Sequence, residues 1–234
     1  VRGHPRAVIF PFATLFRSRV GVAAHVVMGD SVTLKNTVKA IEAGKASVKS
    51  MVLHSLASAE STLTGDEREL GVVLADIGGG TTDIVIYRQG QPWYSAVIPV
   101  GGSQLTRDLS VALKTPLYMT EEMKIKWGSV MPETIPADEE VVIPSFQGQP
   151  KHSLSRRILC DPLNARMMEL IKMIVLKVRQ SGLREFPTGG IVLTGGGAEM
   201  TGLTDLVQKT LGGQVRIAFR SEERRVGKEC RSRW

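Results

Sequence analysis

Cysteine, long hydrophobic runs and a secretory leader pattern are what this sequence of 234 residues lacks. Its two cysteines, Cys160 and Cys230, match neither a disulfide framework nor a metal-binding spacing, which favours a reducing compartment. No apolar run reaches the roughly 18 residues that a membrane-spanning helix needs, and no signal-peptide pattern opens the chain. The remaining composition, 42% hydrophobic and 23% charged, is that of a globular protein of one large or two modest domains.

Net charge is absent from the central part of the chain, although the whole sequence carries +7. Residues 1–19 hold four arginines and no acidic residue, and residues 220–234 hold six basic and three acidic residues. The residues between them hold 20 basic and 20 acidic side chains. This central part offers no electrostatic footprint for DNA or RNA, so no nucleic-acid partner is expected.

The two ends also differ from the rest in pattern. Neither residues 1–19 nor residues 220–234 show a helical or strand periodicity that leads into the neighbouring segment. We therefore expect both to be foreign or disordered segments, with solvated basic tails as the alternative. The interpretation of the fold is based on residues 20–219.

Short apolar runs alternate with helical patterns in this central part, which is typical of the α/β class. Three runs in close succession predict an antiparallel meander. The expected strands are residues 24–28, 48–53, 72–77, 82–87, 93–100, 141–143, 191–194 and 215–218. The expected helices are residues 31–43, 57–63, 103–113, a helix capped by Thr120-Glu121-Glu122 that ends near Trp127, 161–181 and 204–211.

A run of three glycines joins two of the expected strands, in residues 76–83 (DIGGGTTD). Glycines let a backbone approach a ligand without an intervening Cβ, and successive exposed N–H groups form a concavity that suits phosphate. Asp76 ends a buried strand, where its carboxylate could hold Mg²⁺ through water. A tight hairpin turn is the alternative, but the flanking acid and the Thr-Thr-Asp that follows favour a phosphate site.

A second glycine run, Gly195 to Gly197, follows the expected strand 191–194 and leads toward the helix 204–211. Such a junction can seat a nucleotide, because nothing bulky projects and a helix N-terminus is electropositive. No Gly-Lys-Ser/Thr follows, so the segment is neither a P-loop nor a dinucleotide fingerprint.

The two glycine segments together, in this order, resemble the second phosphate loop and the adenosine loop of the actin, Hsp70 and sugar-kinase superfamily of ATPases. Within that superfamily the sequence most resembles the FtsA family of bacterial cell-division proteins, over residues 20–219 and as a piece truncated at both ends. The segments that carry the resemblance are 56–60 (LASAE), 71–83 (GVVLADIGGGTTD), 97–102 (VIPVGG) with Thr106 and Asp108, 120–126, and 189–198 (GGIVLTGGGA) with Gly202-Leu203.

The resemblance implies an ATP and Mg²⁺ site. Asp76 would organise Mg²⁺ and the attacking water. The residues implied to hold the β- and γ-phosphates are Gly78, Gly79, Gly80 and Thr81. Those implied to flank the α-phosphate, ribose and adenine are Gly195, Gly196 and Gly197. Gly101 and Gly102 would end the strand that lines the cleft. Glu122, Lys124 and Lys126 would lie on a helix that faces ribose and adenine, with a solvated helix face as the alternative.

The resemblance also implies an actin-like (ribonuclease H-like) ATPase fold, mostly its second domain with an inserted small subdomain. The implied boundaries are residues 20–70 for the end of the first domain, 71–219 for the second domain, with its core at 71–105 and 151–219, and 106–150 for the inserted subdomain.

The function that the resemblance implies is that of a scaffold. Such a protein forms actin-like filaments and tethers the tubulin-like protein FtsZ to the inner face of the cytoplasmic membrane at the division site. The alternatives are another actin-like scaffold, of the pilus-assembly or filament-forming type, and a sugar or acetate kinase of the same superfamily.

Three departures from the family pattern bear on activity. The sequence lacks the first phosphate loop, an Asp-x-Gly-Thr hairpin. It shows no apolar stripe in residues 220–234 for the membrane-targeting helix of the family. His54 stands where hydrolysing relatives carry Glu or Gln, and we interpret it as a polar residue at the end of the expected strand 48–53. ATP binding is therefore expected, with weak or no hydrolysis.

Overall fold

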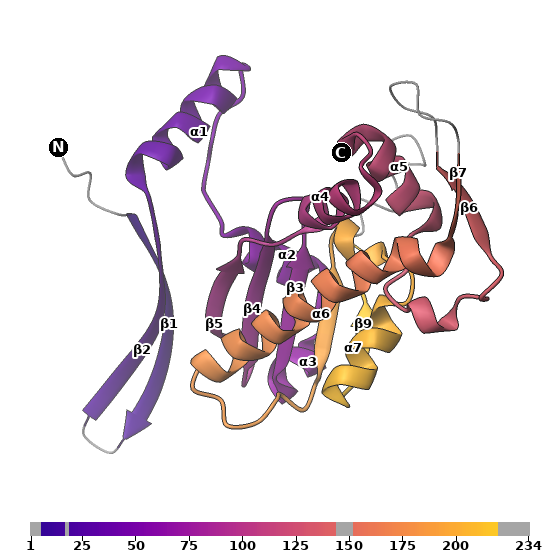
Figure 1. Ribbon diagram of the computed structural model, residues 1–234. Helices are drawn as coiled ribbons and strands as arrows, with labels where there is room; N and C mark the ends of the chain where they lie inside the picture. Colours follow the sequence, from indigo (N-terminus) through magenta and orange to yellow (C-terminus); the bar gives the residue numbers. More distant parts are fainter. Residues whose placement is uncertain (1–5, 17–18, 144–151, 220–234) are drawn as a thin grey trace.

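A five-stranded mixed sheet, with strand order β5-β4-β3-β8-β9, forms the centre of the computed structural model, which describes residues 6–16, 19–143 and 152–219 (Figure 1). The antiparallel meander is confirmed, since β3 pairs with β4 and β4 with β5, while β3 and β9 both run parallel to β8. The strands are β3 (Val72–Ile77), β4 (Thr82–Arg88), β5 (Gln91–Ile98), β8 (Ile191–Thr194) and β9 (Val215–Ile217).

Strand β3 is central because it is apolar on both faces and every one of its residues is buried. Val73, Ala75 and Ile77 point into the larger hydrophobic core, and Val72 and Leu74 into a smaller core on the opposite face. The alternation follows from the two-residue period of a strand. The polar exception is Asp76, which is 2% exposed and lies on the face of the smaller core.

The larger core is covered by three helices, α4 (Gly102–Leu113), α6 (Arg156–Gln180) and α7 (Leu203–Leu211). Helix α6 begins five residues before its expected start at Asp161. Leu159 and Cys160 are fully buried and continue its apolar stripe toward the N-terminus. The Arg156 and Arg157 side chains also anchor the first turn, by donating to the carbonyls of Trp127 and Ile135.

The smaller core is covered by α2 (His54–Thr62), with α3 (Gly65–Leu70) following it along the chain. The expected strand at residues 48–53 is wrong, because no neighbouring strand pairs with this segment in the described chain. His54 therefore begins a helix rather than ending a strand. The sequence pattern also missed α3, whose start is fixed by a capping box between Thr64 and Glu67.

The segment expected to form the small subdomain contains α5 (Leu117–Trp127), the 3₁₀ turn η1 (Pro132–Thr134) and the hairpin of β6 (Glu140–Ile143) and β7 (His152–Ser155), and its status as a separate subdomain stays a prediction. The hairpin extends past the expected subdomain boundary at residue 150. Thr120 lies inside α5 instead of capping it, because the helix begins directly after Pro116 and the Thr120 hydroxyl donates back to the Pro116 carbonyl.

The N-terminal elements are β1 (Arg6–Phe16), β2 (Arg19–Gly29) and α1 (Ser31–Ala43), which stand on the β5 side of the main sheet in Figure 1. Strand β1 pairs with β2 along its whole length, although its sequence pattern had predicted no strand. His25 of β2 contacts Ser95 of β5 through a hydrogen bond of 3.0 Å, and burial lowers the pKa of His25. The foreign origin of residues 1–19 stays a prediction, and residues 220–234 lie outside the described residues.

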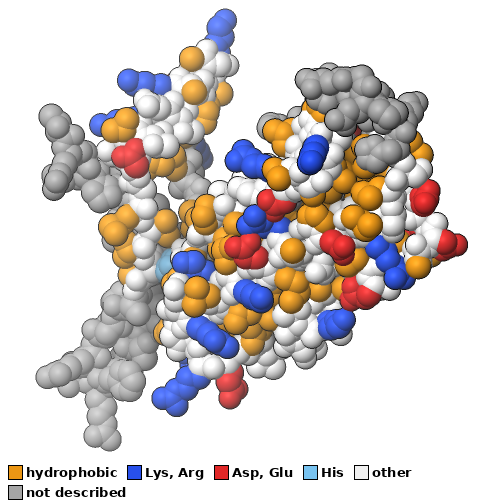
Figure 2. Space-filling view, viewed as in Figure 1, with side chains coloured by type: hydrophobic (Ala, Val, Ile, Leu, Met, Phe, Trp, Pro, Cys, Tyr) orange, Lys and Arg blue, Asp and Glu red, His pale blue; other side chains and the backbone are white. Residues whose placement is uncertain are grey.

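Surface charge on the main body is mixed, with acidic and basic side chains interspersed over the face shown in Figure 2. Among the described helices, none has both the length and the apolar character required to cross a bilayer.

Candidate functional site

The two glycine segments lie side by side at one end of the main sheet. Strands β3 and β8 are parallel neighbours, with Asp76 paired to Thr194, so the loops that follow them leave the sheet together (Figure 1). A Cβ built on Gly195 would lie 2.5 Å from Asp76 Oδ1. The two glycine segments, far apart in the sequence, therefore lie together in space, and their use as one ligand site stays a prediction.

Asp76 is held below the surface of this site. The Ser58 hydroxyl of α2 donates a hydrogen bond of 2.6 Å to Asp76 Oδ2. His54 Nδ1, on the first turn of the same helix, lies 3.5 Å from Asp76 Oδ2 and 3.7 Å from Asp83 Oδ2. One buried carboxylate with a hydroxyl donor fits an outer-sphere role toward Mg²⁺, which keeps most of its own water.

The loop after β3 is docked on the first turn of α4 by its carbonyl groups. Gly102 N donates to Gly78 O at 2.9 Å, and Ser103 N donates to Gly79 O at 2.7 Å. A Cβ on Gly101 would lie 2.5 Å from Gly78 O, so glycine is required there by the close approach of two backbones. The N-terminal amides of α4 are therefore occupied by the loop and do not face a ligand.

The opposite side of this loop is open. Gly79 and Gly80 are exposed, and their N–H groups have no hydrogen-bond partner among the described residues. A Cβ on either glycine would meet no atom within 4 Å, and neither has a positive φ, so the fold itself does not require glycine at these two positions. Free N–H groups beside open space can receive an anion.

The second glycine segment is built differently from the sequence prediction. Gly195 has a φ of 84°, and Gly196–Glu199 forms a short 3₁₀ turn, η2. Helix α7 begins only at Leu203, after Gly202 with a φ of 82°. Helix α7 thus starts one residue before its expected start at Thr204, and its N-terminus does not abut the glycines. Gly196 faces open space, whereas a Cβ on Gly197 would collide with Ile77.

The three expected residues of α5 do not share one face, because residues two apart on a helix point in different directions. Lys124 is buried and donates to Gly102 O at 3.1 Å and to Thr106 Oγ1 at 2.8 Å, which places it beside the start of α4. It also forms an ion pair of 2.8 Å with Glu121. Glu122 and Lys126 are exposed, and the Lys126 ammonium lies over the Trp127 ring.

Two residues of the site were missed from the sequence, Ser58 and Gln104. Ser58 follows His54 by four residues, the spacing that places two side chains on one helix face, and this spacing was a usable signal. Gln104 follows Gly101 by three residues, the spacing of a capping box, and its side chain accepts from Gly101 N at 2.9 Å.

Known proteins similar to this chain in sequence identify its family. The family model for "Cell division protein FtsA" matches residues 73–228. The FtsA proteins of Pseudomonas aeruginosa and Escherichia coli K12 are each 38% identical to the chain, over 85% of its length and 48% and 49% of theirs. That of Borreliella burgdorferi is 35% identical, over 88% of the chain and 50% of its own length. The chain thus spans about half the length of the curated relatives it matches.

Solved structures confirm the fold. A PilM–PilN type IV pilus biogenesis complex aligns with 97% of the chain and 61% of its own chain, at a TM-score of 0.70 and 17% identity. MreB5 of Spiroplasma citri bound to ADP aligns with 81% of the chain and 61% of its own chain, at a TM-score of 0.64 and 18% identity. The α/β fold is therefore that of the actin-like ATPases. Together with the match of the family model, these findings establish that the chain belongs to the FtsA family of cell-division proteins.

Proposed function

We propose that the chain binds ATP with Mg²⁺ between its two glycine loops, as part of an actin-like protein that acts in cell division. The observation that carries this proposal is the loop from Gly78 to Gly80, whose carbonyls are bound to α4 while the N–H groups of Gly79 and Gly80 remain open to a ligand. The MreB5 relatives bound to ADP and AMPPNP support a nucleotide as that ligand.

In this proposal the β- and γ-phosphates lie against Gly79, Gly80 and Thr81, and Asp76 orients the water shell of Mg²⁺. Bound Mg²⁺ would offset the phosphate charge and polarise the γ-phosphate. The second loop, Gly195 to Gly197, flanks the α-phosphate and the nucleoside.

The cellular role that we propose follows the family. The protein assembles into actin-like filaments and tethers FtsZ to the inner face of the cytoplasmic membrane at the division site. The small subdomain is the part that we assign to FtsZ, and it exposes large apolar side chains to solvent, namely Leu117, Tyr118, Ile125 and Val142. Attachment to the membrane is assigned to a C-terminal amphipathic helix of the kind found in the family. Pelleting of the chain with FtsZ polymers tests the tethering role, and absence from the pellet contradicts it.

Replacement of Gly79 tests the nucleotide site directly. Gly79→Val places two methyl groups in the open space over the loop, so ATP affinity should fall about tenfold or more while the fold is unchanged. Titration with ATP followed by NMR measures the affinity, and the melting temperature checks the fold. Gly213→Val is the matched control, since Gly213 also faces open space but lies away from both loops. Equal ATP affinities for the two variants would contradict the assignment.

Replacement of Asp76 tests the magnesium role. Asp76→Asn keeps the shape and the acceptor for Ser58 but removes the charge, so it should weaken ATP binding in the presence of Mg²⁺ by about tenfold. Binding in the presence of a chelator should change little. Titrations with and without Mg²⁺ measure the difference, with the exposed Asp138→Asn as control. Equal losses under both conditions would show that Asp76 has a structural role only.

A further inference from the structure

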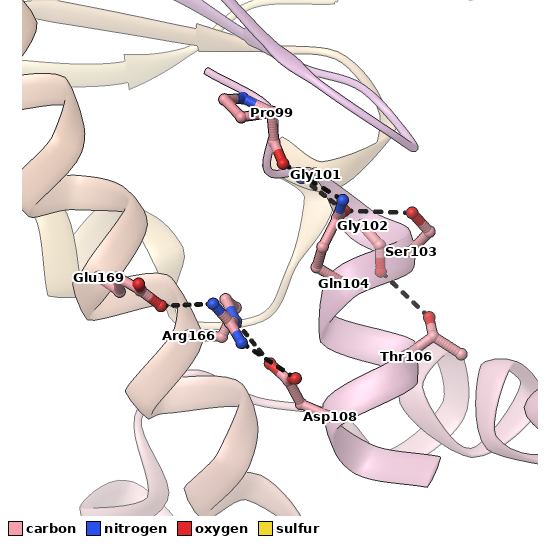
Figure 3. A network of polar contacts seen from close by, with 9 residues as sticks. All are labelled: Pro99, Gly101, Gly102, Ser103, Gln104, Thr106, Asp108, Arg166 and Glu169. Atoms are coloured by element: carbon pink, nitrogen blue, oxygen red, sulfur yellow. Dashed lines mark hydrogen bonds and ion pairs between the residues drawn. The ribbon is translucent and has the colours of Figure 1, made fainter. Parts of the chain in front are cut away.

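Gln104 lies on the first turn of α4, and its amide is oriented by its neighbours. Its Oε1 accepts from Gly101 N at 2.9 Å and from the Ser103 hydroxyl at 3.1 Å (Figure 3). Because the Gly101 N–H can only donate, the atom facing it must be the oxygen, and the Ser103 hydroxyl then donates to the same oxygen. The amide nitrogen therefore faces the carbonyls of Pro99 and Gly80, at 3.3 and 3.4 Å.

With the contact to Gly80, all three carbonyl groups of the glycine run have a hydrogen-bond donor on α4. The carbonyls of Gly78 and Gly79 are bound by backbone amides of α4, and the carbonyl of Gly80 is bound by the Gln104 side chain. Among the described residues, no other side chain binds a carbonyl of this glycine run. Each carbonyl is coplanar with the N–H of the next residue, so the contacts of the Gly78 and Gly79 carbonyls turn the N–H groups of Gly79 and Gly80 to the open side. The Gln104 contact fixes the following peptide, between Gly80 and Thr81, and so anchors the end of the loop.

The geometry points to Gln104 as a positioning residue that holds the phosphate loop in its anion-receiving orientation. This inference rests on the proposed nucleotide site. It adds Gln104, which lies outside the two glycine segments from which that site was proposed. Gln104 does not touch the ligand in this arrangement, and it acts through the Gly80 carbonyl.

The neutrality of Gln104 is part of this role. A capping box accepts Glu as readily as Gln, and a carboxylate there is favoured by the helix dipole. Glu at position 104 would still accept from Gly101 N, but it could not donate to Gly80 O or Pro99 O. It would also place a negative charge beside a site for phosphate. Helix stability alone therefore favours Glu, whereas anion binding requires the amide.

Helix α4 is held firmly enough to act as a support for the loop. Asp108, one turn beyond Gln104, accepts two hydrogen bonds from Arg166 of α6, at 2.5 and 3.1 Å, and Arg166 also pairs with Glu169 (Figure 3). These hydrogen bonds raise the pKa of Arg166. A bidentate pair of this kind fixes the orientation of two helices as well as their distance.

The experiment compares the full 234-residue chain with Gln104→Glu and Gln104→Ala, and with Gln208→Glu on the exposed side of α7 as the matched charge control. The ¹⁵N order parameters of Gly79 and Gly80 are measured without ligand, and Mg²⁺–AMPPNP is then titrated. In Gln104→Glu the order parameters should fall from about 0.85 to below roughly 0.6, since the loop loses its third contact. AMPPNP affinity should fall about three- to tenfold, while the melting temperature stays equal or rises.

Gln104→Ala should loosen the loop in the same way, with a smaller loss of AMPPNP affinity because no charge is introduced, and Gln208→Glu should change neither quantity. Unchanged loop order and AMPPNP affinity in both Gln104 variants, beside a binding wild type, would overturn the role of Gln104 and leave the nucleotide site standing. No binding of AMPPNP to the wild type would overturn the proposed function and the inference with it.

Discussion

Gly195→Ala is expected to lower the free energy of unfolding by about 2–5 kcal/mol, a large part of the total stability of a typical domain. The backbone at Gly195 has a φ of 84° and a ψ of 165°, a region that is essentially restricted to glycine. The added methyl group would also lie 2.5 Å from Asp76 Oδ1 and 2.6 Å from Ile77 O. The backbone strain and the steric overlap of the added methyl group therefore both destabilise the fold at residue 195.

The matched control is Gly196→Ala, one residue further along. Gly196 has no positive φ, and its Cβ position meets no atom within 4 Å, so this variant should unfold within about 0.5 kcal/mol of the wild type. Urea denaturation followed by circular dichroism measures both variants. Equal denaturation midpoints for the two variants would contradict the close approach of the glycine loop to β3.

A polypeptide of these 234 residues is expected to bind ATP in the millimolar range and to release no measurable phosphate. The sequence holds one Asp-x-Gly-Gly pattern, at Asp76, whereas the family resemblance implies phosphate contacts from two loops. Each missing charge-assisted hydrogen bond costs roughly 1.5–3 kcal/mol, and each 1.4 kcal/mol is about a tenfold loss of affinity. Phosphoryl transfer depends almost entirely on positioning and charge stabilisation, so hydrolysis should suffer more than binding.

Calorimetry and a phosphate-release assay on the chain measure these two quantities. His54 Nδ1 lies 3.5 Å from Asp76 Oδ2 and 3.7 Å from Asp83 Oδ2, and the family resemblance predicts that His54 stands where hydrolysing relatives carry Glu or Gln. Micromolar binding with steady phosphate release would show that the loop from Gly78 to Thr81 supports turnover without a second phosphate loop.

The strands and helices that were predicted well from the sequence are those with a local and regular pattern. The bounds of β3 and α1 were predicted to the residue. Strand β3 is an apolar run that ends at a glycine, and α1 has a 3.6-residue apolar period, and both signals depend only on residues close together in the sequence. The family resemblance predicted that the two glycine loops share one nucleotide site, and the parallel register of β3 and β8 brings the two loops together.

The features that were missed depend on partners distant in the sequence. Residues 48–53 have the composition of a strand but pair with no neighbour in the part of the chain that the structure describes, and β1 pairs there with β2. The inward direction of Lys124 depends on the position of Thr106 and Gly102 on another helix. The docking of the glycine carbonyls on α4 is made by hydrogen bonds between two backbones, so the side chains in the sequence do not indicate it.

The parallel pairing of β3 with β8 has a consequence for how the protein folds. The meander of β3, β4 and β5 can form as soon as its residues leave the ribosome, because its pairings are local. The apolar edge of β3 stays uncovered until residues 191–194 emerge, after the whole of α6. During translation this apolar edge of β3 therefore stays unpaired while residues 78–190 are made, and the two glycine loops first meet only when β8 closes that edge.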